Sequence, residues 1–351
     1  MSKSKLTLIV DGNWLLMSRK SVMNNRFNTD EELIKELKLL MIKSLNVVLR
    51  TFPSIDNIMF VSDGGSWRNN IEIPEFLQKE GVEYKGNRVQ DPNTDWKVIF
   101  DGYHDFIDTM KNCGINVYRE QNIEGDDWCW YLSQKLNSEG TNCIIWTRDH
   151  DLMQLVKTNS DGCFTAWYEK DSGLYLEEKA DEDLNFLFNM NFNENEALMN
   201  ELINNSKKVT NIKPINIVID KIIRGDSGDN ILPIVKHKGR NSEKEFRVSN
   251  KEINFNINPY DDNNIKLWID NLIETKPYVG RIVGDKTPQE IFEHFKYNRK
   301  LVSLDERSYP YEVYEIMCNY IDYECCKDTK AVEEKLEAQK NDVEDIINDI
   351  F

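Results

Sequence analysis

The sequence is poor in the residues that build many metal and hydrolase sites. It has four histidines, and its seven cysteines are scattered without a pair spaced as C-x-x-C. These features argue against a Cys/His zinc site, a disulfide framework and histidine-based catalysis, and they indicate a reducing compartment. The N-terminal apolar run is too short for a signal peptide, and no run approaches the length of a membrane span. We expect a cytoplasmic protein that does not enter a membrane.

Basic residues are also scarce relative to acidic ones, 44 against 61, which gives a net charge of −17. That sum argues only weakly against a nucleic-acid partner, because binding depends on where the charge lies. Residues 207–251 hold 11 Lys or Arg against 5 Asp or Glu, and residues 276–300 hold 6 against 3. These stretches could bind a nucleic-acid backbone, or they could be solvated basic loops.

Short β-branched runs alternate with helical patterns in the first half of the chain. The expected strands are 6–10, 58–61, 115–118, 143–146 and 163–168, and the expected helices are 29–51, 95–112 and 124–136. This alternation predicts an α/β domain with a central, mostly parallel sheet over 1–180. Helical patterns dominate the remainder, at 181–189, 194–205, 214–224, 263–274, 287–298, 309–323 and 330–350. We therefore expect a second, helical domain over 181–351.

Carboxylates follow the ends of four expected strands, at Asp11, Asp63, Glu124 and Asp149. Because the carboxyl ends of parallel strands meet at one edge of a sheet, we expect these side chains to converge. Their sequence neighbours and the pair in IIRGDSGDN complete a set of nine acids: Asp11, Asp63, Glu124, Asp126, Asp127, Asp149, Asp151, Asp226 and Asp229.

Each acid has an ordinary explanation when taken alone. Asp11 and Asp63 each precede a glycine and could lie in turns, and Asp126 or Asp127 could favour the helix dipole. Asp149 and Asp151 could be solvated loop residues, and GDSGD could be a flexible turn. Nine acids from five segments at one edge would repel one another, so they need cations. Ligand sets made only of oxygen favour two or more Mg²⁺ ions, with Mn²⁺ as a substitute. Two such ions suit the attack of water on a phosphodiester.

Together the motifs resemble those of the 5′-nuclease superfamily, the flap endonucleases and 5′–3′ exonucleases. The matching strings are LIVDGNW, FVSDGGSWR, YKGNR, EGDD, TRDHD and RGDSGDN. The resemblance covers most of 1–300 and is greatest to the bacteriophage ribonuclease H-like replication 5′-nucleases. It implies a PIN-like nuclease core over 1–180 with an arch over about 66–97. It also implies a helical C-terminal domain over 181–351, with a modified helix-three-turn-helix DNA-binding element at about 214–300.

The resemblance implies a role for each matching residue. A first metal ion would be held by Asp11, Asp63, Glu124 and Asp126. A second would be held by Asp126, Asp149, Asp151 and Asp226, with Asp127 and Asp229 as outer acids. The catalytic residues near the scissile phosphate would be Lys85 and Arg88. The DNA-binding residues would be Tyr84, which would stack on a base, and Arg68, Arg281, Gly284, Lys286, Lys236, Lys238 and Arg240. Gly125 stands where the family has Ala, an exchange that we expect to leave the acids in place.

The implied function is a Mg²⁺-dependent 5′-nuclease that cleaves branched or nicked DNA and RNA–DNA hybrids in primer removal and repair. It would act as a monomer, in the host cytoplasm if a phage encodes it. The alternatives are a PIN-like endoribonuclease, against which YKGNR and the long helical region argue, and a non-catalytic DNA-structure-binding protein, against which the full acid set argues. The tail at 344–351 could pack on its own domain or anchor a sliding clamp or single-strand-binding protein.

Overall fold

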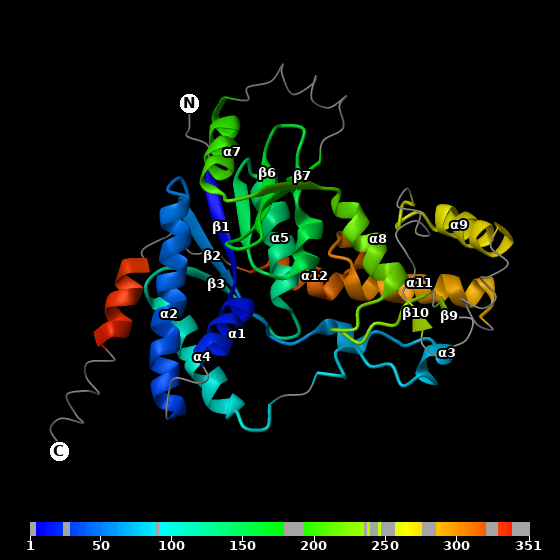
Figure 1. Cartoon of the computed structure of the whole chain (residues 1–351), viewed down its shortest axis with the longest axis horizontal. Helices are drawn as coiled ribbons and strands as arrows, with labels where there is room; N and C mark the ends of the chain where they lie inside the picture. Colours follow the sequence, from blue (N-terminus) through cyan, green and yellow to red (C-terminus); the bar gives the residue numbers. More distant parts are fainter. Residues whose placement is uncertain are drawn as a thin grey trace. The chain divides into compact units, whose positions relative to one another are not determined.

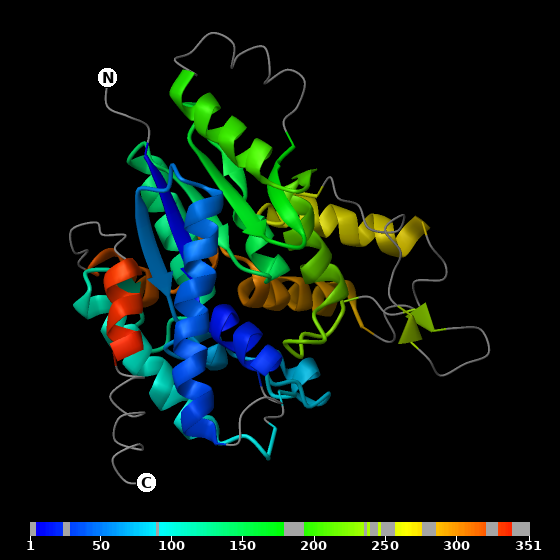
Figure 2. The same ribbon diagram turned by 60° about the vertical axis from the view of Figure 1, so that its left-hand side comes forward.

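The structure of the protein is a computed structural model. It describes residues 5–23, 29–88, 91–178, 193–234, 237–238, 245–246, 257–275, 286–320 and 329–338. The chain divides into two compact units, shown from two directions in Figures 1 and 2. The first unit comprises Met1–Gly65, Asp91–Ile212 and Glu315–Phe351, and the second comprises Ser66–Gln90 and Lys213–Tyr314. Each unit has its own hydrophobic core.

The first unit is built on an eight-stranded sheet with the order β3-β2-β1-β4-β6-β7-β8, and β5 pairs with β6 off this path. The strands are β1 (Leu6–Asp11), β2 (Asn57–Val61), β3 (Asn116–Tyr118), β4 (Asn142–Trp146), β5 (Lys157–Thr158), β6 (Phe164–Glu169), β7 (Gly173–Glu177) and β8 (Val209–Ile212). The five strands from β3 to β6 along the path run parallel, whereas β5 and β7 each pair antiparallel with β6. The predicted central, mostly parallel sheet is confirmed.

Helices cover both faces of this sheet. They are α1 (Gly12–Met23), α2 (Asp30–Thr51), α4 (Trp96–Asn112), α5 (Gly125–Ser138), η2 (His150–Leu155) and α7 (Asn193–Asn205), and residues 329–338 are also helical. The longest, α2, begins at a threonine cap, where the Thr29 hydroxyl accepts the backbone N–H of Glu32 (3.3 Å). Acids fill its first turn and Arg50 lies in its last turn. Charges of these signs at the two ends interact favourably with the helix dipole and stabilise the helix.

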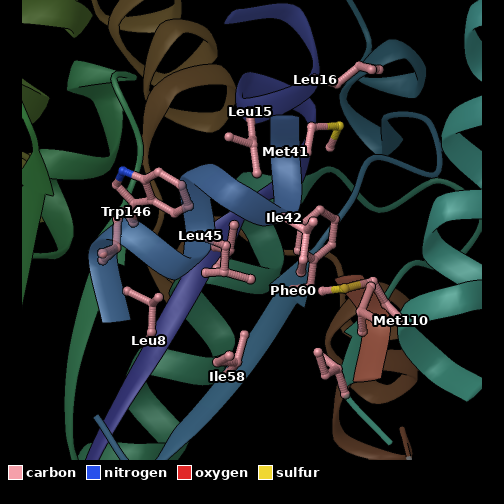
Figure 3. Packing of buried hydrophobic residues seen from close by; sticks show 14 of the residues in the cluster. Leu8, Leu15, Leu16, Met41, Ile42, Leu45, Ile58, Phe60, Met110 and Trp146 are labelled. Carbon is pink, nitrogen blue, oxygen red and sulfur yellow. The ribbon is translucent and has the colours of Figure 1, made fainter. Parts of the chain in front are cut away.

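The main core lies between α2 and the sheet. Figure 3 shows Ile42 and Leu45 of α2 facing Leu8 of β1 and Ile58 of β2, and all four are fully buried. Successive strand residues point to opposite faces, and α5 packs against β1 and β4. All six residues of β1 are buried, as expected for a parallel strand covered on both sides.

The second unit is largely helical. Its elements are η1 (Trp67–Asn70), α3 (Glu75–Gln78), α8 (Pro214–Arg224), β9 (His237–Lys238), β10 (Glu245–Phe246), α9 (Asp262–Thr275), α11 (Pro288–Val302) and η3 (Glu306–Ser308). Helix α12 (Tyr311–Cys318) begins in this unit, which ends at Tyr314. Apolar residues of α8, α9 and α11 form one core with Leu77, Val82 and Tyr84. The predicted helical C-terminal region is therefore present.

Several elements depart from the sequence prediction. Helix α1 and strands β5, β7 and β8 are additional, and α12 is shorter than the predicted 309–323. The predicted boundary at residue 180 falls before β8, yet β8 pairs with β7 and extends the sheet of the first unit. The expected helix at 181–189 and the tail at 344–351 lie outside the described residues. Within the described ranges, the structure has no helix with the length and apolar character of a membrane span.

Two substitutions on α2 test this packing. Leu45→Ala should lower the free energy of unfolding by about 2–5 kcal/mol, because it leaves a cavity in the core of the first unit. Val47, two residues along and 44% exposed, is the matched control. Val47→Ala should change the free energy of unfolding by less than about 0.5 kcal/mol. Urea denaturation of both variants measures this, and equal destabilisation would contradict the assignment of the core.

Candidate active site

The order of the strands gathers the acids at one edge of the first unit. Strand β1 lies between β2 and β4. The chain therefore adds β2 and β3 on one side of β1 and then reverses direction to add β4 and β6 on the other side. Ligands of open parallel sheets bind beside the strand carboxyl ends at such a reversal. Asp11 is the last residue of β1, Asp63 follows β2, Glu124 directly precedes α5, and Asp149 follows β4.

Asp11 is buried and is held by two neutral donors. The backbone N–H of Trp14 donates to Oδ1 (3.0 Å), and the Thr147 hydroxyl donates to Oδ2 (2.8 Å). Burial raises the pKa of Asp11 to about 7; the charges of Asp63 and Asp149 raise it further, and the two hydrogen bonds lower it. The carboxylate thus lies where negative charge is poorly solvated and other acids are close.

The Asp63 carboxylate accepts hydrogen bonds from the first turns of two helices, α5 and α1. Its Oδ1 accepts the backbone N–H of Gly125 (2.7 Å) at the start of α5, and its Oδ2 accepts Nδ2 of Asn13 (2.7 Å) at the start of α1. A Cβ on Gly125 would lie 3.1 Å from Asp63 Oδ1. An alanine here would require the Asp63 carboxylate to give way by a few tenths of an ångström, and the expectation that the exchange to Gly125 leaves the acids in place stays a prediction.

The EGDD segment forms the start of α5. Glu124 is the residue before the helix, and the buried Asp127 carboxylate accepts its backbone N–H (3.0 Å). Glu124 itself is 6% exposed, whereas Asp126 is half-buried. Asp127 therefore fixes the helix start that presents the other two acids. Trp128 is fully buried and packs against Tyr118, which anchors the same turn in the core.

The TRDHD segment caps the short helix η2. Asp149 is its cap, and Oδ1 accepts the backbone N–H of Asp151 (2.8 Å). The Asp149 carbonyl accepts Nε1 of Trp167 (2.9 Å), and its backbone N–H donates to the Thr147 hydroxyl (2.9 Å). Asp149 is exposed and Asp151 is half-buried, so both carboxylates lie at the surface of the edge.

The charges of acids from three segments act on one buried thiol of α5. Burial raises the pKa of the Cys129 thiol on α5 well above its usual range, and the charges of Asp11, Asp126 and Asp149 raise it further. These acids come from β1, α5 and the segment after β4, and the charge of Asp63 also acts on Asp11.

Glycines beside the first two acids serve close packing. A Cβ on Gly12 would lie 2.2 Å from the ring of Phe60 and 2.4 Å from the Tyr103 hydroxyl. A Cβ on Gly64 would lie 1.8 Å from the carbonyl oxygen of Glu120. The turn explanation for Asp11-Gly12 is wrong, because Gly12 is the first residue of α1.

In the second unit, the GDSGDN segment forms a closed loop after α8. Gly225 ends the helix at φ +65°, and a Cβ there would lie 2.2 Å from the Ile231 carbonyl oxygen. Asp226 and Ile231 exchange two backbone hydrogen bonds (2.9 and 2.8 Å), and Asp226 pairs with Lys221. Burial raises the pKa of Asp226, but the Lys221 contact and the backbone N–H groups of the loop outweigh it and hold that pKa below its usual value. Asp229 brings a carboxylate oxygen within 4.8 Å of one of Asp226.

The YKGNR turn packs on this loop. The backbone N–H of Lys85 donates to the Asp229 carbonyl (2.9 Å), and Asn87 Nδ2 donates to the Ser227 carbonyl (2.7 Å). The Arg88 guanidinium forms an ion pair with Asp229 (2.5 Å). Lys85 has φ +56°, a left-handed conformation that is uncommon outside glycine. The two motifs therefore form one assembly that presents basic and acidic groups together.

Three predicted DNA-binding residues have structural roles within the second unit. Tyr84 is 9% exposed and packs in the core, and Arg68 is 3% exposed and donates Nε to the Leu301 carbonyl (2.9 Å). Both side chains are largely covered within the second unit, and their DNA-binding roles stay predictions. Lys286 lies 3.7 Å from the Glu80 carboxylate and over the ring of Phe76, so it is already engaged.

Most of the other predicted DNA-binding residues lie outside the part of the chain that the structure describes. Arg281, Gly284, Lys236 and Arg240 lie outside the described residues. Lys238 lies in β9, which pairs antiparallel with β10, and its proposed role stays a prediction.

The sequence motifs contain two site residues that were not assigned from the sequence. Asn13 and Thr147 stand inside LIVDGNW and TRDHD, and each hydrogen-bonds to a predicted ligand. Their signal was weak, because a polar side chain beside an acid is common on any loop. Only the tertiary contact distinguishes them.

The fold is similar to that of solved bacteriophage proteins. The 5′-exonuclease of bacteriophage T5, solved with divalent zinc ions, is 15% identical and aligns with a TM-score of 0.51 over 95% of this chain and 100% of that chain. The T5 D15 protein co-crystallised with metal ions is 14% identical, with a TM-score of 0.50 over 95% and 98% of the two chains. Identities this low show a shared fold, the PIN-like 5′-nuclease core with its helical C-terminal region.

Sequence comparison shows the family. A family model for the 5′-3′ exonuclease N-terminal resolvase-like domain matches residues 6–185, just over half of the 351 residues. The chain therefore belongs to the 5′-3′ exonuclease family. A 5′-3′ exonuclease of Buchnera aphidicola subsp. Schizaphis graminum is 27% identical over 160 residues, and that of subsp. Acyrthosiphon pisum is 24% identical over 157 residues. Both alignments cover 45% of this chain and 51% of the relative, so the chain spans about half the length of the curated relatives it matches.

The pKa of Asp11 predicts a pH-dependent stability. In EDTA, the free energy of unfolding of the wild type should fall relative to that of Asp11→Asn as the pH rises from about 4 to about 7. The unfolded chain loses this proton near the ordinary pKa of 3.8, whereas the folded carboxyl keeps it up to about 7, so rising pH favours the unfolded state across that window. The full difference is at most about 4 kcal/mol. Urea denaturation at several pH values measures it, and a pH-independent difference would contradict the burial.

Proposed function

We propose that this protein is a divalent-metal-dependent 5′-nuclease, a 5′–3′ exonuclease or flap endonuclease. It would hydrolyse phosphodiesters of branched or nicked DNA and of RNA–DNA hybrids, as in primer removal and repair. The observation that carries the proposal is the position of Asp11, Asp63 and Asp149 at or after the carboxyl ends of parallel strands, with Thr147 bonded to Asp11 and Asp149, and with Asp63 bonded to the start of α5, which carries Asp126. Family membership and the exonuclease relatives support the same reaction class.

The donor chemistry of this edge fits a hard divalent cation. The converging groups are carboxylates, and the buried Asp11 carboxyl has a pKa of about 7 because its charge is poorly solvated. A cation would favour its ionised form and relieve the repulsion among the acids. Mg²⁺ is the proposed ion, with Mn²⁺ as a substitute, because both prefer oxygen ligands. Bound there, the ions would supply an activated water and stabilise the leaving oxygen.

In the first unit we propose Asp11, Asp63, Glu124, Asp126, Asp149 and Asp151 as ligands. Asp127 would support them by fixing the start of α5, where it accepts the backbone N–H of Glu124. The ligand roles of Asp226 and Asp229 in the second unit stay predictions from the family resemblance.

Lys85 and Arg88 are the proposed phosphate-binding residues. The Arg88 side chain is 59% exposed although it pairs with Asp229, and Lys85 is half-buried with its ammonium over the ring of Tyr84. Cations held in a fixed turn can neutralise phosphates without reading sequence. The buried Tyr84 anchors the turn by packing in the core of the second unit.

The cellular setting is proposed more generally. The buried, free cysteines 129, 143 and 163 suit a reducing cytoplasm. A sliding clamp or a single-strand-binding protein is a proposed partner of the C-terminal tail, whose residues the structure does not describe.

Substitution of one ligand tests the reaction. Asp126→Asn should lower cleavage of a 5′-labelled flap and of an RNA–DNA hybrid in Mg²⁺ by at least about 100-fold, because it removes a carboxylate ligand. Glu139→Gln is the matched control, since Glu139 is an exposed acid that caps the far end of the same helix. The control should cleave like the wild type. Cleavage by Asp126→Asn at the wild-type rate, or cleavage in EDTA, would refute the mechanism.

A second test separates the charge of Lys85 from its backbone shape. Lys85→Asn removes the ammonium but suits φ +56°, because asparagine tolerates the left-handed conformation. Its affinity for nucleic acid should fall uniformly across sequences, and the slope of log affinity against log salt should fall by about one. Lys111→Asn is the control, because Lys111 is exposed in the last turn of α4, before the amino end of β3. Equal slopes for Lys85→Asn and the wild type would show that Lys85 contacts no phosphate.

A further inference from the structure

Asn13, the second residue of α1, joins three elements of the first unit through one amide. Its Oδ1 accepts the Ser62 hydroxyl (3.1 Å), the backbone N–H of Asp63 (3.1 Å) and the Tyr103 hydroxyl (3.2 Å). Its Nδ2 donates to Asp63 Oδ2 (2.7 Å). The residue therefore contacts both the backbone and the carboxylate of Asp63.

The contacts fix which way the amide faces. A backbone N–H can only donate, so the Asp63 N–H requires the oxygen of Asn13 on its side. The nitrogen then faces the Asp63 carboxylate. A carboxylate in place of this amide would repel Asp63, and a shorter hydroxyl could not span both contacts. The side-chain amide therefore supplies an acceptor for the backbone N–H of Asp63 and a donor for its carboxylate.

The surroundings hold Asn13 in place. Tyr103 of α4 is 3% exposed, and burial raises its pKa well above its usual range, so its hydroxyl stays a donor. The adjacent Gly12 lies so close to Tyr103 and Phe60 that no side chain fits there. The start of α1 is thus packed tightly against β2 and α4, and Asn13 has little room to move.

We propose that Asn13 is a positioning residue that orients the Asp63 carboxylate toward a divalent cation. This role rests on the proposed metal-dependent nuclease function. Asp63 has two carboxylate oxygens, and Asn13 and Gly125 each donate a hydrogen bond to one of them. Together the two donors fix the plane of the carboxylate. Such partners of a ligand set both its orientation and its basicity.

The test measures Mn²⁺ binding by the full chain without nucleic acid, for example by electron paramagnetic resonance of the free ion. Asn13→Ala should raise the dissociation constant for Mn²⁺ by about tenfold, the low end of the effect of removing a ligand's partner. In flap cleavage, the Mn²⁺ concentration for half-maximal rate should rise with it, and saturating Mn²⁺ should restore most of the rate.

Tyr103→Phe is the control for a purely structural role. It removes one donor to Asn13 but leaves the bond from Asn13 to Asp63 intact, so Mn²⁺ affinity should stay at the wild-type value. Thermal unfolding in EDTA measures structural damage separately in both variants. If folded Asn13→Ala binds Mn²⁺ as tightly as the wild type, the positioning role is overturned while the proposed function stands. If the wild type binds no Mn²⁺, both are overturned.

Asn13→Asp serves if the alanine variant does not fold. It keeps the shape and the acceptor oxygen but turns the donor into a second carboxylate oxygen opposite Asp63. The repulsion should lower the unfolding temperature in EDTA, and Mn²⁺ should raise that temperature by more than it does in the wild type. An equal Mn²⁺-induced shift in the two proteins would overturn the positioning role.

Discussion

The hydrogen bond from Thr147 to the buried Asp11 carboxylate is the interaction on which the first unit's site depends. A carboxylate inside a parallel sheet is expensive to ionise unless it accepts hydrogen bonds. Thr147 supplies one of these bonds, and its hydroxyl also accepts the backbone N–H of Asp149. One side chain thereby ties the end of β1 to the segment after β4, which is where the strand order reverses. Thr147 thus holds two of the proposed metal ligands, Asp11 and Asp149, at the place where the strand order reverses.

The two units treat their acids differently. In the first unit, neutral donors hold Asp11, and its pKa rises to about 7. In the second, the Lys221 cation contacts Asp226 and Arg88 contacts Asp229, and the pKa of Asp226 falls. A carboxylate paired with lysine already has a counter-charge, whereas a metal ion beside the buried Asp11 would favour its ionised form. The two sets of acids therefore differ in the charge that a bound cation would meet.

Much of this arrangement could be predicted from sequence, because it depends on periodicity and on strand ends. The strands that carry Asp11 and Asp63 are short apolar runs, and the acids directly follow them. Burial could not be predicted in the same way. Tyr84 and Arg68 stand in motifs that read as nucleic-acid contacts, yet both are covered by neighbours that lie far away in sequence, such as Leu301 for Arg68. Residue type shows what a side chain can bind, and only packing shows what it already binds.

The small residues of the motifs are constrained as strongly as the acids. Gly12 permits α1 to start against Phe60 and Tyr103, and that close start brings Asn13 within reach of Asp63. A larger residue at position 12 would push the helix away and lengthen the Asn13 contact even though every carboxylate remained. Ligand geometry here is set by how closely the backbone approaches the sheet. The motif DGN therefore acts as one structural unit, in which the glycine sets the distance, the asparagine sets the orientation of Asp63, and Asp11 supplies the charge.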